Sequence, residues 1–145
     1  MTPLKLLVQD EEDLGVVSAY LQDAVIRAGD IAYIAKQRRF AAVLTRFCWE
    51  GCPDGEKGTR VRSGLHFDSV LSVKTTHVTR GNPDAVVELL AIQFHPESET
   101  GGTIDLVLAG GGRIRLEVEC IDAQLRDLTE PRPAIARPAH DLEHR

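Results

Sequence analysis

The sequence predicts a mainly β protein of the α+β class. We expect an antiparallel sandwich or a partly open small barrel, with an N-terminal helix and a short C-terminal helix. Apolar and polar residues alternate with period two in several segments, and polar or glycine-containing turns separate these segments. No strand–helix–strand unit recurs along the chain. The pattern indicates about eight strands.

The clearest element is the stretch 103–120, TIDLVLAGGGRIRLEVEC, which predicts a hairpin with one buried face. A two-residue turn at Gly110 and Gly111 would pair Leu106 with Arg115 and mix apolar and charged residues on one face, so it is rejected. A loop of three residues, or of five, keeps the apolar residues together. The three-residue loop predicts the pairs Leu106–Ile114, Ile104–Leu116 and Asp105–Arg115, with the ion pair on the other, exposed face.

Beyond this hairpin the apolar spacing changes from two to a helical period. The stripe that shows it comprises Val118, Ile121, Leu125 and Leu128. It predicts a short helix that packs over the apolar face of the sheet. Residues 129–145 contain three prolines and no apolar period, so we expect a single globular domain over 1–128 and a C-terminal tail that is disordered or strapped to the surface.

The N-terminal segment predicts a short strand over Leu4 to Val8, followed by a helix that Asp10 caps. Acidic residues follow in the first turn, where the helix dipole favours them. The apolar stripe of the helix comprises Leu14, Val17 and Leu21. A helix this short needs the sheet in order to be stable.

The middle of the chain predicts further strands. Ala24 to Ala28 and Ile31 to Ala35 are interpreted as a second hairpin, and a long strand over Arg39 to Trp49 presents apolar residues on both faces. Val61, Leu65 and Phe67 then alternate with Arg60, Arg62 and His66, which predicts a strand with a basic outer face. Further strands are expected over Leu71 to Val78 and Ala85 to Phe94.

Charge is unevenly distributed along the 145 residues, whose net charge is −5. Residues 26–80 hold ten bases against five acids, whereas the two flanking segments are acidic. Basic strands that pair with acidic neighbours within one fold account for this pattern, and an anion-binding face is the alternative. The negative total argues against a nucleic-acid partner.

One group of residues in this basic segment is a candidate anion or partner face, because guanidinium groups beside an aromatic ring bind phosphate or carboxylate. Its members lie on or beside two neighbouring predicted strands and are Arg39, Arg46, Trp49, Glu50, Arg60 and Arg62. A salt-bridged sheet surface and one side of a dimer remain alternative interpretations.

Other constellations are weaker. A zinc site would need Cys48 and Cys52 with two of His66, His77 and His95, and a nucleophilic triad would need Cys120, His66 and Asp68. Zinc ligands are usually more tightly spaced than these cysteines, and the parity of Cys120 places it toward the core, where nothing activates a thiol. We therefore expect no metal, no cofactor and no catalytic residue.

Compartment and partners follow from composition. No apolar run approaches membrane-spanning length, and the N-terminus shows no signal-peptide pattern, so we expect a cytoplasmic protein without a membrane partner. Three cysteines, an odd number, fit reduced thiols there. A homodimer with an unidentified protein partner is the expected assembly.

Several short motifs occur together: EDL at Glu12 to Leu14, LQDA at Leu21 to Ala24, RRF at Arg38 to Phe40, RFCWE at Arg46 to Glu50, and AGGGRIRLEVEC at Ala109 to Cys120. In this combination the chain resembles a small bacterial family of unknown function, found mainly in alphaproteobacteria. The resemblance implies no activity and no catalytic residues. The expected layout of strands closed by a C-terminal helix is itself similar to the pleckstrin-homology-like barrel.

Two functions remain open. The first is a non-enzymatic binding or scaffolding module, and the second is a small-molecule anion-binding or enzymatic site lined by the arginines. A concave pocket that holds Arg46, Trp49 and either Arg60 or Arg62 would favour the second, and a flat strand face would favour the first.

Overall fold

A computed structural model describes residues 3–48, 59–78, 81–129 and 132–133. Its elements are β1 (Lys5–Val8), α1 (Glu11–Tyr20), β2 (Val25–Ile34), the 3-10 turn η1 (Ala35–Gln37), β3 (Arg39–Cys48), β4 (Thr59–Phe67), β5 (Val70–Thr76), β6 (Val86–Pro96), β7 (Gly102–Leu108), the 3-10 turn η2 (Ala109–Gly111), β8 (Arg113–Val118), β9 (Ala123–Asp127) and β10 (Arg132–Pro133). The mainly β class is confirmed, with ten described strands rather than eight.

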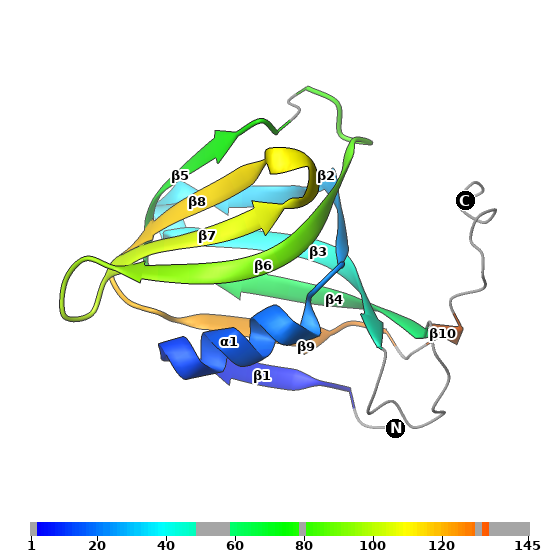
Figure 1. The fold of residues 1–145 in the computed structure, drawn as a ribbon, viewed down its shortest axis with the longest axis horizontal. Coiled ribbons are helices and arrows are strands. Elements are labelled where there is room, and N and C mark those ends of the chain that lie inside the picture. Colours follow the sequence, from blue (N-terminus) through cyan, green and yellow to red (C-terminus); the bar gives the residue numbers. More distant parts are fainter. Residues whose placement is uncertain (1–2, 49–58, 79–80, 130–131, 134–145) are drawn as a thin grey trace.

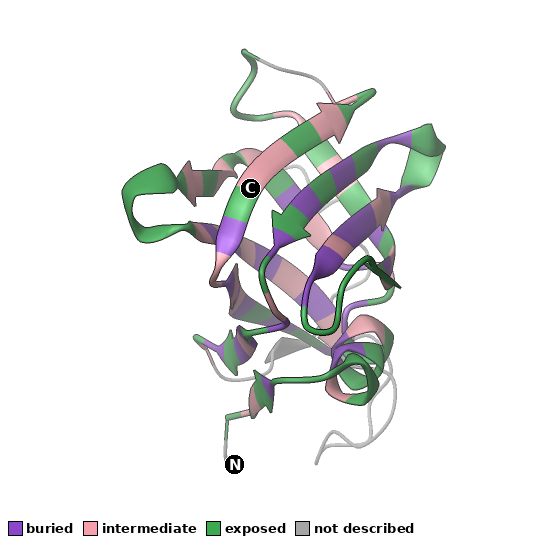
Figure 2. Ribbon diagram, turned by 90° about the vertical axis from the view of Figure 1, so that its left-hand side faces the viewer, coloured by how far each residue is buried: buried purple, intermediate pink, exposed green. Residues whose placement is uncertain are grey.

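The described strands form one antiparallel sheet in the order β1-β9-β4-β3-β2-β6-β7-β8-β5, and β10 pairs with β4. The sheet curls into an open barrel, so that β5 to β8 lie across from β2 to β4 (Figure 1). Strands β1 and β5 lie at the two ends of this order. Burial alternates along the strands, because one face of each strand turns into the barrel (Figure 2).

Helix α1 is confirmed as predicted. The backbone N–H of Asp13 donates to the Asp10 carboxylate at 2.8 Å, which caps the helix, and Leu14 and Val17 are buried in the core. The helix packs against β1 and β6, where the N–H of Ile92 donates to the Ser18 hydroxyl at 2.9 Å. Its stability therefore depends on the sheet that it covers.

The β7–β8 hairpin has the predicted register, with Leu106 opposite Ile114 and Asp105 opposite Arg115. The loop is the three-residue turn η2, and the N–H of Leu108 donates to the carbonyl of Gly112 at 2.9 Å to close it. Gly110 and Gly111 both have positive φ, at 85° and 92°, which side chains disfavour. Local turn chemistry and strand parity therefore determine this hairpin.

The predicted C-terminal helix is wrong, because residues 123–127 form strand β9. Strand β9 pairs with β1 on one side and β4 on the other, and its residues Ala123, Leu125 and Asp127 point inward. Leu128, which the helical stripe placed against the sheet, is 51% exposed. Without β9, one edge of β1 and one edge of β4 would have unpaired backbone groups. A strand between them satisfies both edges, and this outweighs the weak helical period of the sequence.

The predicted second hairpin is also wrong, because Val25–Ile34 is one continuous strand with a register shift between Ile26 and Ile31. The expected turn residue Gly29 instead donates its N–H to the carbonyl of Pro83 at 2.9 Å. A Cβ atom on Gly29 would lie 2.9 Å from the Cβ of Pro83, so only glycine fits this approach. Glycine is therefore required here by the close approach to Pro83 in a distant loop, and not by a local turn.

Candidate functional site

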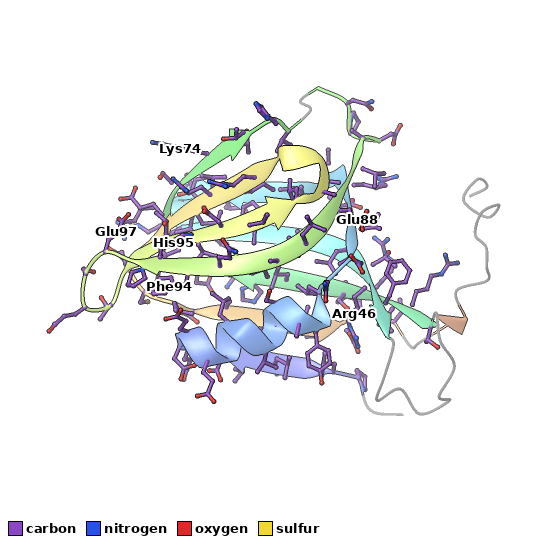
Figure 3. All side chains as sticks on the ribbon, in the orientation of Figure 1. Arg46, Lys74, Glu88, Phe94, His95 and Glu97 are labelled. Carbon is purple, nitrogen blue, oxygen red and sulfur yellow. The ribbon has the colours of Figure 1, made fainter. Side chains whose placement is uncertain are left out.

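The side chain of Arg46 lies inside the barrel. Its Nε and Nη2 atoms donate to the two carboxylate oxygens of Asp127 at 3.0 and 2.9 Å, and the side chains are only 6% and 5% exposed. Asp127 also accepts from the Ser63 hydroxyl at 2.8 Å and from the backbone N–H of Leu4 at 2.9 Å. The guanidinium carbon lies 5.6 Å from the centre of the Tyr20 ring. Figure 3 shows Arg46 near the C-terminal end of α1.

This cluster, which we call the Arg46–Asp127 clamp, joins β3, β4, β9, α1 and the residue before β1. Burial alone would raise the pKa of Asp127, but hydrogen bonds from Arg46, Leu4 and Ser63 outweigh it and hold the pKa below its usual value. The guanidinium of Arg46 and the carboxylate of Asp127 form a bidentate pair, with two parallel hydrogen bonds. The guanidinium of Arg46 therefore has both of these donors, Nε and Nη2, engaged by Asp127.

A pH prediction follows from the lowered pKa of Asp127. The unfolded chain binds this proton at the ordinary Asp pKa of about 3.9, above the folded value, so it holds more protons in that range. The contribution of the clamp is present above that pH and is lost as the pH falls through the folded pKa. Urea titrations between neutral and strongly acidic pH are expected to show this loss, and Asp127→Asn should flatten it. Parallel curves for the two proteins would contradict the assignment.

The other arginines of the predicted face do not join Arg46. Arg39 donates to Asp68 at 2.7 Å near the start of β3, and this hydrogen bond raises the pKa of Arg39 despite its partial burial. Arg60 and Arg62 project from the outer face of β4, where Arg62 lies 3.9 Å from Asp30. Trp49 and Glu50 lie outside the described residues. The basic outer face of β4 is confirmed, but the structure separates it from Arg46 by the thickness of the sheet.

The Asp105–Arg115 ion pair was expected on an exposed face. The side chain of Asp105 faces away from the apolar core, as expected, but it is only 3% exposed. Arg115 donates to both of its oxygens, at 2.8 and 3.0 Å, while Arg113 and His95 lie 3.8 and 3.3 Å away. The Arg115 hydrogen bond lowers the pKa of Asp105, against the opposing effect of burial, and Arg113 and His95 lower it further. Three long side chains cover this carboxylate, which strand parity alone does not reveal.

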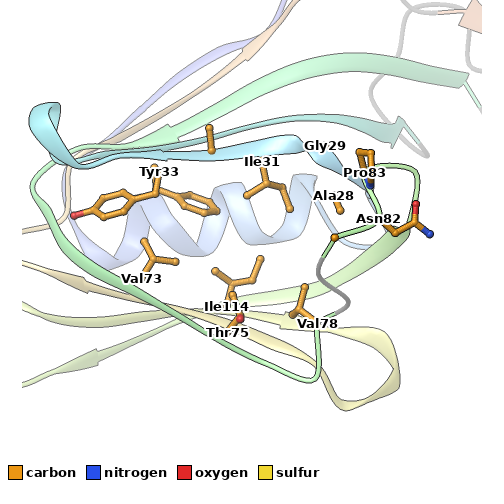
Figure 4. A pocket seen from close by; sticks show the side chains of 13 residues that line it. Ala28, Gly29, Ile31, Tyr33, Val73, Thr75, Val78, Asn82, Pro83 and Ile114 are labelled. Atoms are coloured by element: carbon orange, nitrogen blue, oxygen red, sulfur yellow. The ribbon is translucent and has the colours of Figure 1, made fainter.

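The feature best suited to hold a ligand is a cavity of about 440 Å³ between β2 and β5. Ile31 and Tyr33 project from β2 toward Val73, Thr75 and Ile114 on the opposite wall (Figure 4). The full lining comprises Ala28, Gly29, Ile31, Ala32, Tyr33, Phe40, Val73, Thr75, Val78, Gly81, Asn82, Pro83 and Ile114. We call it the β2–β5 cavity.

None of the described residues that line the β2–β5 cavity carries a formal charge at neutral pH. The one phenol among them, Tyr33, donates its hydroxyl to the carbonyl of Val70 at 2.8 Å. The sequence pattern did not predict this cavity. Val73 and Thr75 lie two residues apart on β5, so their side chains share one face. The sequence does not show that β5 pairs with β8 and lies across the cavity from β2.

The weaker constellations are only partly visible. Within the described ranges, no three His, Cys, Asp or Glu side chains form a group that could hold a metal ion. Cys52 lies outside these ranges, and Cys120 is a partly buried free thiol just after β8. The helix in the described part of the chain is too short to span a membrane.

Comparison with known proteins identifies one family. A family model described as "Protein of unknown function (DUF2948)" matches residues 4–140. No curated protein and no solved structure matches the chain.

Proposed function

We propose a function for this chain, which belongs to the DUF2948 family of proteins of unknown function: it is a non-enzymatic binding module whose ligand site is the β2–β5 cavity. The uncharged lining of a cavity of about 440 Å³ carries the proposal. Cavities of this size are in the range that proteins use for ligands. Transfer of an apolar group from water into this cavity would be favourable. Transfer of a charged group would be unfavourable, because the charge would lose its hydration and find no opposite charge in the lining.

The lining also supports binding rather than catalysis. General acid–base chemistry needs a side chain that exchanges protons near neutral pH, and a nucleophile needs an adjacent base. The described lining residues supply one phenol, Tyr33, which is engaged with a backbone carbonyl. The alternative, an anion site formed by the arginines, has less support because Arg46 and Arg39 each already hold a carboxylate.

The proposal is tested with N-phenyl-1-naphthylamine, an uncharged fluorophore that brightens in apolar surroundings. We expect saturable binding to the protein, because the cavity offers apolar wall on two sides. Val73→Trp, which fills the cavity, should weaken this binding by at least about tenfold, since it removes the space for the ring system. Leu71→Trp is the matched control, on the same strand but exposed and outside the lining. Equal affinities for the two variants would place the fluorophore elsewhere.

We propose further that the module works in the bacterial cytoplasm and that residues 1–128 form its single domain. The free thiol of Cys120 suits a reducing compartment, and β10, in the segment after residue 128, is strapped onto β4. The curled sheet would be a variant of the pleckstrin-homology-like layout, with α1 and β9 in place of the closing helix.

We also propose a homodimer that forms through β1. This strand is one edge of the sheet, and its Leu7 is 62% exposed. Pairing of two β1 strands would bury that side chain and satisfy edge backbone groups. Light scattering after size exclusion should give twice the chain mass, and Leu7→Lys should give a monomer. A monomeric wild-type protein would refute this assembly.

A further inference from the structure

The edge of β5 opens onto the β2–β5 cavity. Among the described residues, β5 pairs with β8 and lies at the end of the sheet. The backbone groups of Val70 point away from β8: its N–H donates to the carbonyl of Arg38 at 2.9 Å, and its carbonyl accepts from Tyr33 at 2.8 Å. The side of β5 that faces away from β8 therefore faces the turn between β2 and β3.

The backbone N–H and carbonyl of Val73 also point away from β8, as the geometry of the β7–β8 hairpin shows. The closing bond between Leu108 and Gly112 sets the alternation of the β7–β8 ladder, so that Arg115 directs its N–H and carbonyl toward β5. Arg115 lies opposite Lys74, which therefore bonds to β8. Val73, one residue earlier, presents its N–H and carbonyl to the open edge.

The side chain of Val73 points into the β2–β5 cavity, as does that of Thr75 two residues later. A strand added beside β5 would continue this alternation and place every second side chain in the cavity. The intervening side chains would lie on the outer face, beside the exposed and positively charged Lys74. The cavity thus favours apolar residues, and the outer face favours acidic ones.

We propose that the natural occupant of the cavity is an extended peptide segment of a partner protein, which adds as a strand to β5. Its apolar residues alternate with neutral or acidic ones. This inference rests on the proposed function, but it commits to a peptide rather than a small apolar molecule. A peptide backbone supplies both the donor and the acceptor that the edge at Val73 requires, whereas an alkyl or aromatic molecule supplies neither.

The experiment selects peptides from a random phage-displayed library on the wild-type protein, with counter-selection on Val73→Trp. We expect an enriched consensus with apolar residues at alternate positions and acidic or neutral residues between them. The synthetic consensus peptide should bind in calorimetry and displace N-phenyl-1-naphthylamine. A version N-methylated at the amides that face β5 should bind at least about tenfold more weakly, because it cannot donate to the strand edge.

Lys74→Glu should weaken binding of an acidic consensus peptide, and Leu7→Glu on the other edge strand should not. The N-methylated peptide keeps the test independent of the folding of any variant. Equal binding of the methylated and unmethylated peptides would overturn strand addition. Absence of an enriched consensus, with the fluorophore still bound, would overturn the peptide and leave a small-molecule site. Failure of the fluorophore to bind would instead refute the proposed function.

Discussion

Arg46→Ala is expected to lower the free energy of unfolding by about 3 to 5 kcal/mol. The substitution leaves the Asp127 carboxylate inside the barrel, where its side chain is 5% exposed, with hydrogen bonds from Ser63 and Leu4 but no opposite charge. A buried charge without its partner costs far more than an exposed one. Urea titration monitored by circular dichroism measures the loss.

Two further variants separate this explanation from simple loss of packing. Arg60→Ala, which removes an exposed guanidinium from the adjacent strand, should change stability by no more than about 0.5 kcal/mol. The double variant Arg46→Met/Asp127→Leu should regain much of the loss, because an apolar pair of similar volume needs no compensating charge. If Arg46→Ala and Arg60→Ala have equal small effects, Arg46 is not buried in the clamp.

Leu116→Ala is expected to cost about 2 to 5 kcal/mol, since it opens a cavity where two strand pairs meet. Leu116 is 0% exposed and lies opposite Ile104 on β7 and Val73 on β5. The surrounding side chains come from several strands, so they cannot collapse freely into the space. The same urea titration applies.

The matched control for this substitution is Leu128→Ala, which removes the same atoms from a residue that is 51% exposed. Its effect should stay within about 1 kcal/mol, because the residue loses little buried contact. Comparable losses at both positions would mean that Leu128 packs against the sheet, as the predicted C-terminal helix required.

The sequence alone determined those elements whose local pattern was compatible with a single structure. The parity of residues 103–118 allowed only an odd loop, and the β7–β8 register agrees with it. Asp10 followed by acidic residues and an apolar stripe determined the start of α1. The inward position of Arg46 has a signal in the sequence, because Arg46 continues the alternating series of Phe40, Ala42 and Leu44, which are buried.

Tertiary contacts decided the elements whose local patterns were ambiguous. Residues 121–128 fit both a helical stripe and an alternating strand, and the edges of β1 and β4 selected the strand. Gly29 can form a turn, but its approach to Pro83 kept β2 continuous. The β2–β5 cavity depends on the curvature of the whole sheet, which brings β5 across from β2. Curvature accumulates from the twist of many strand pairs, so no single segment of sequence encodes it.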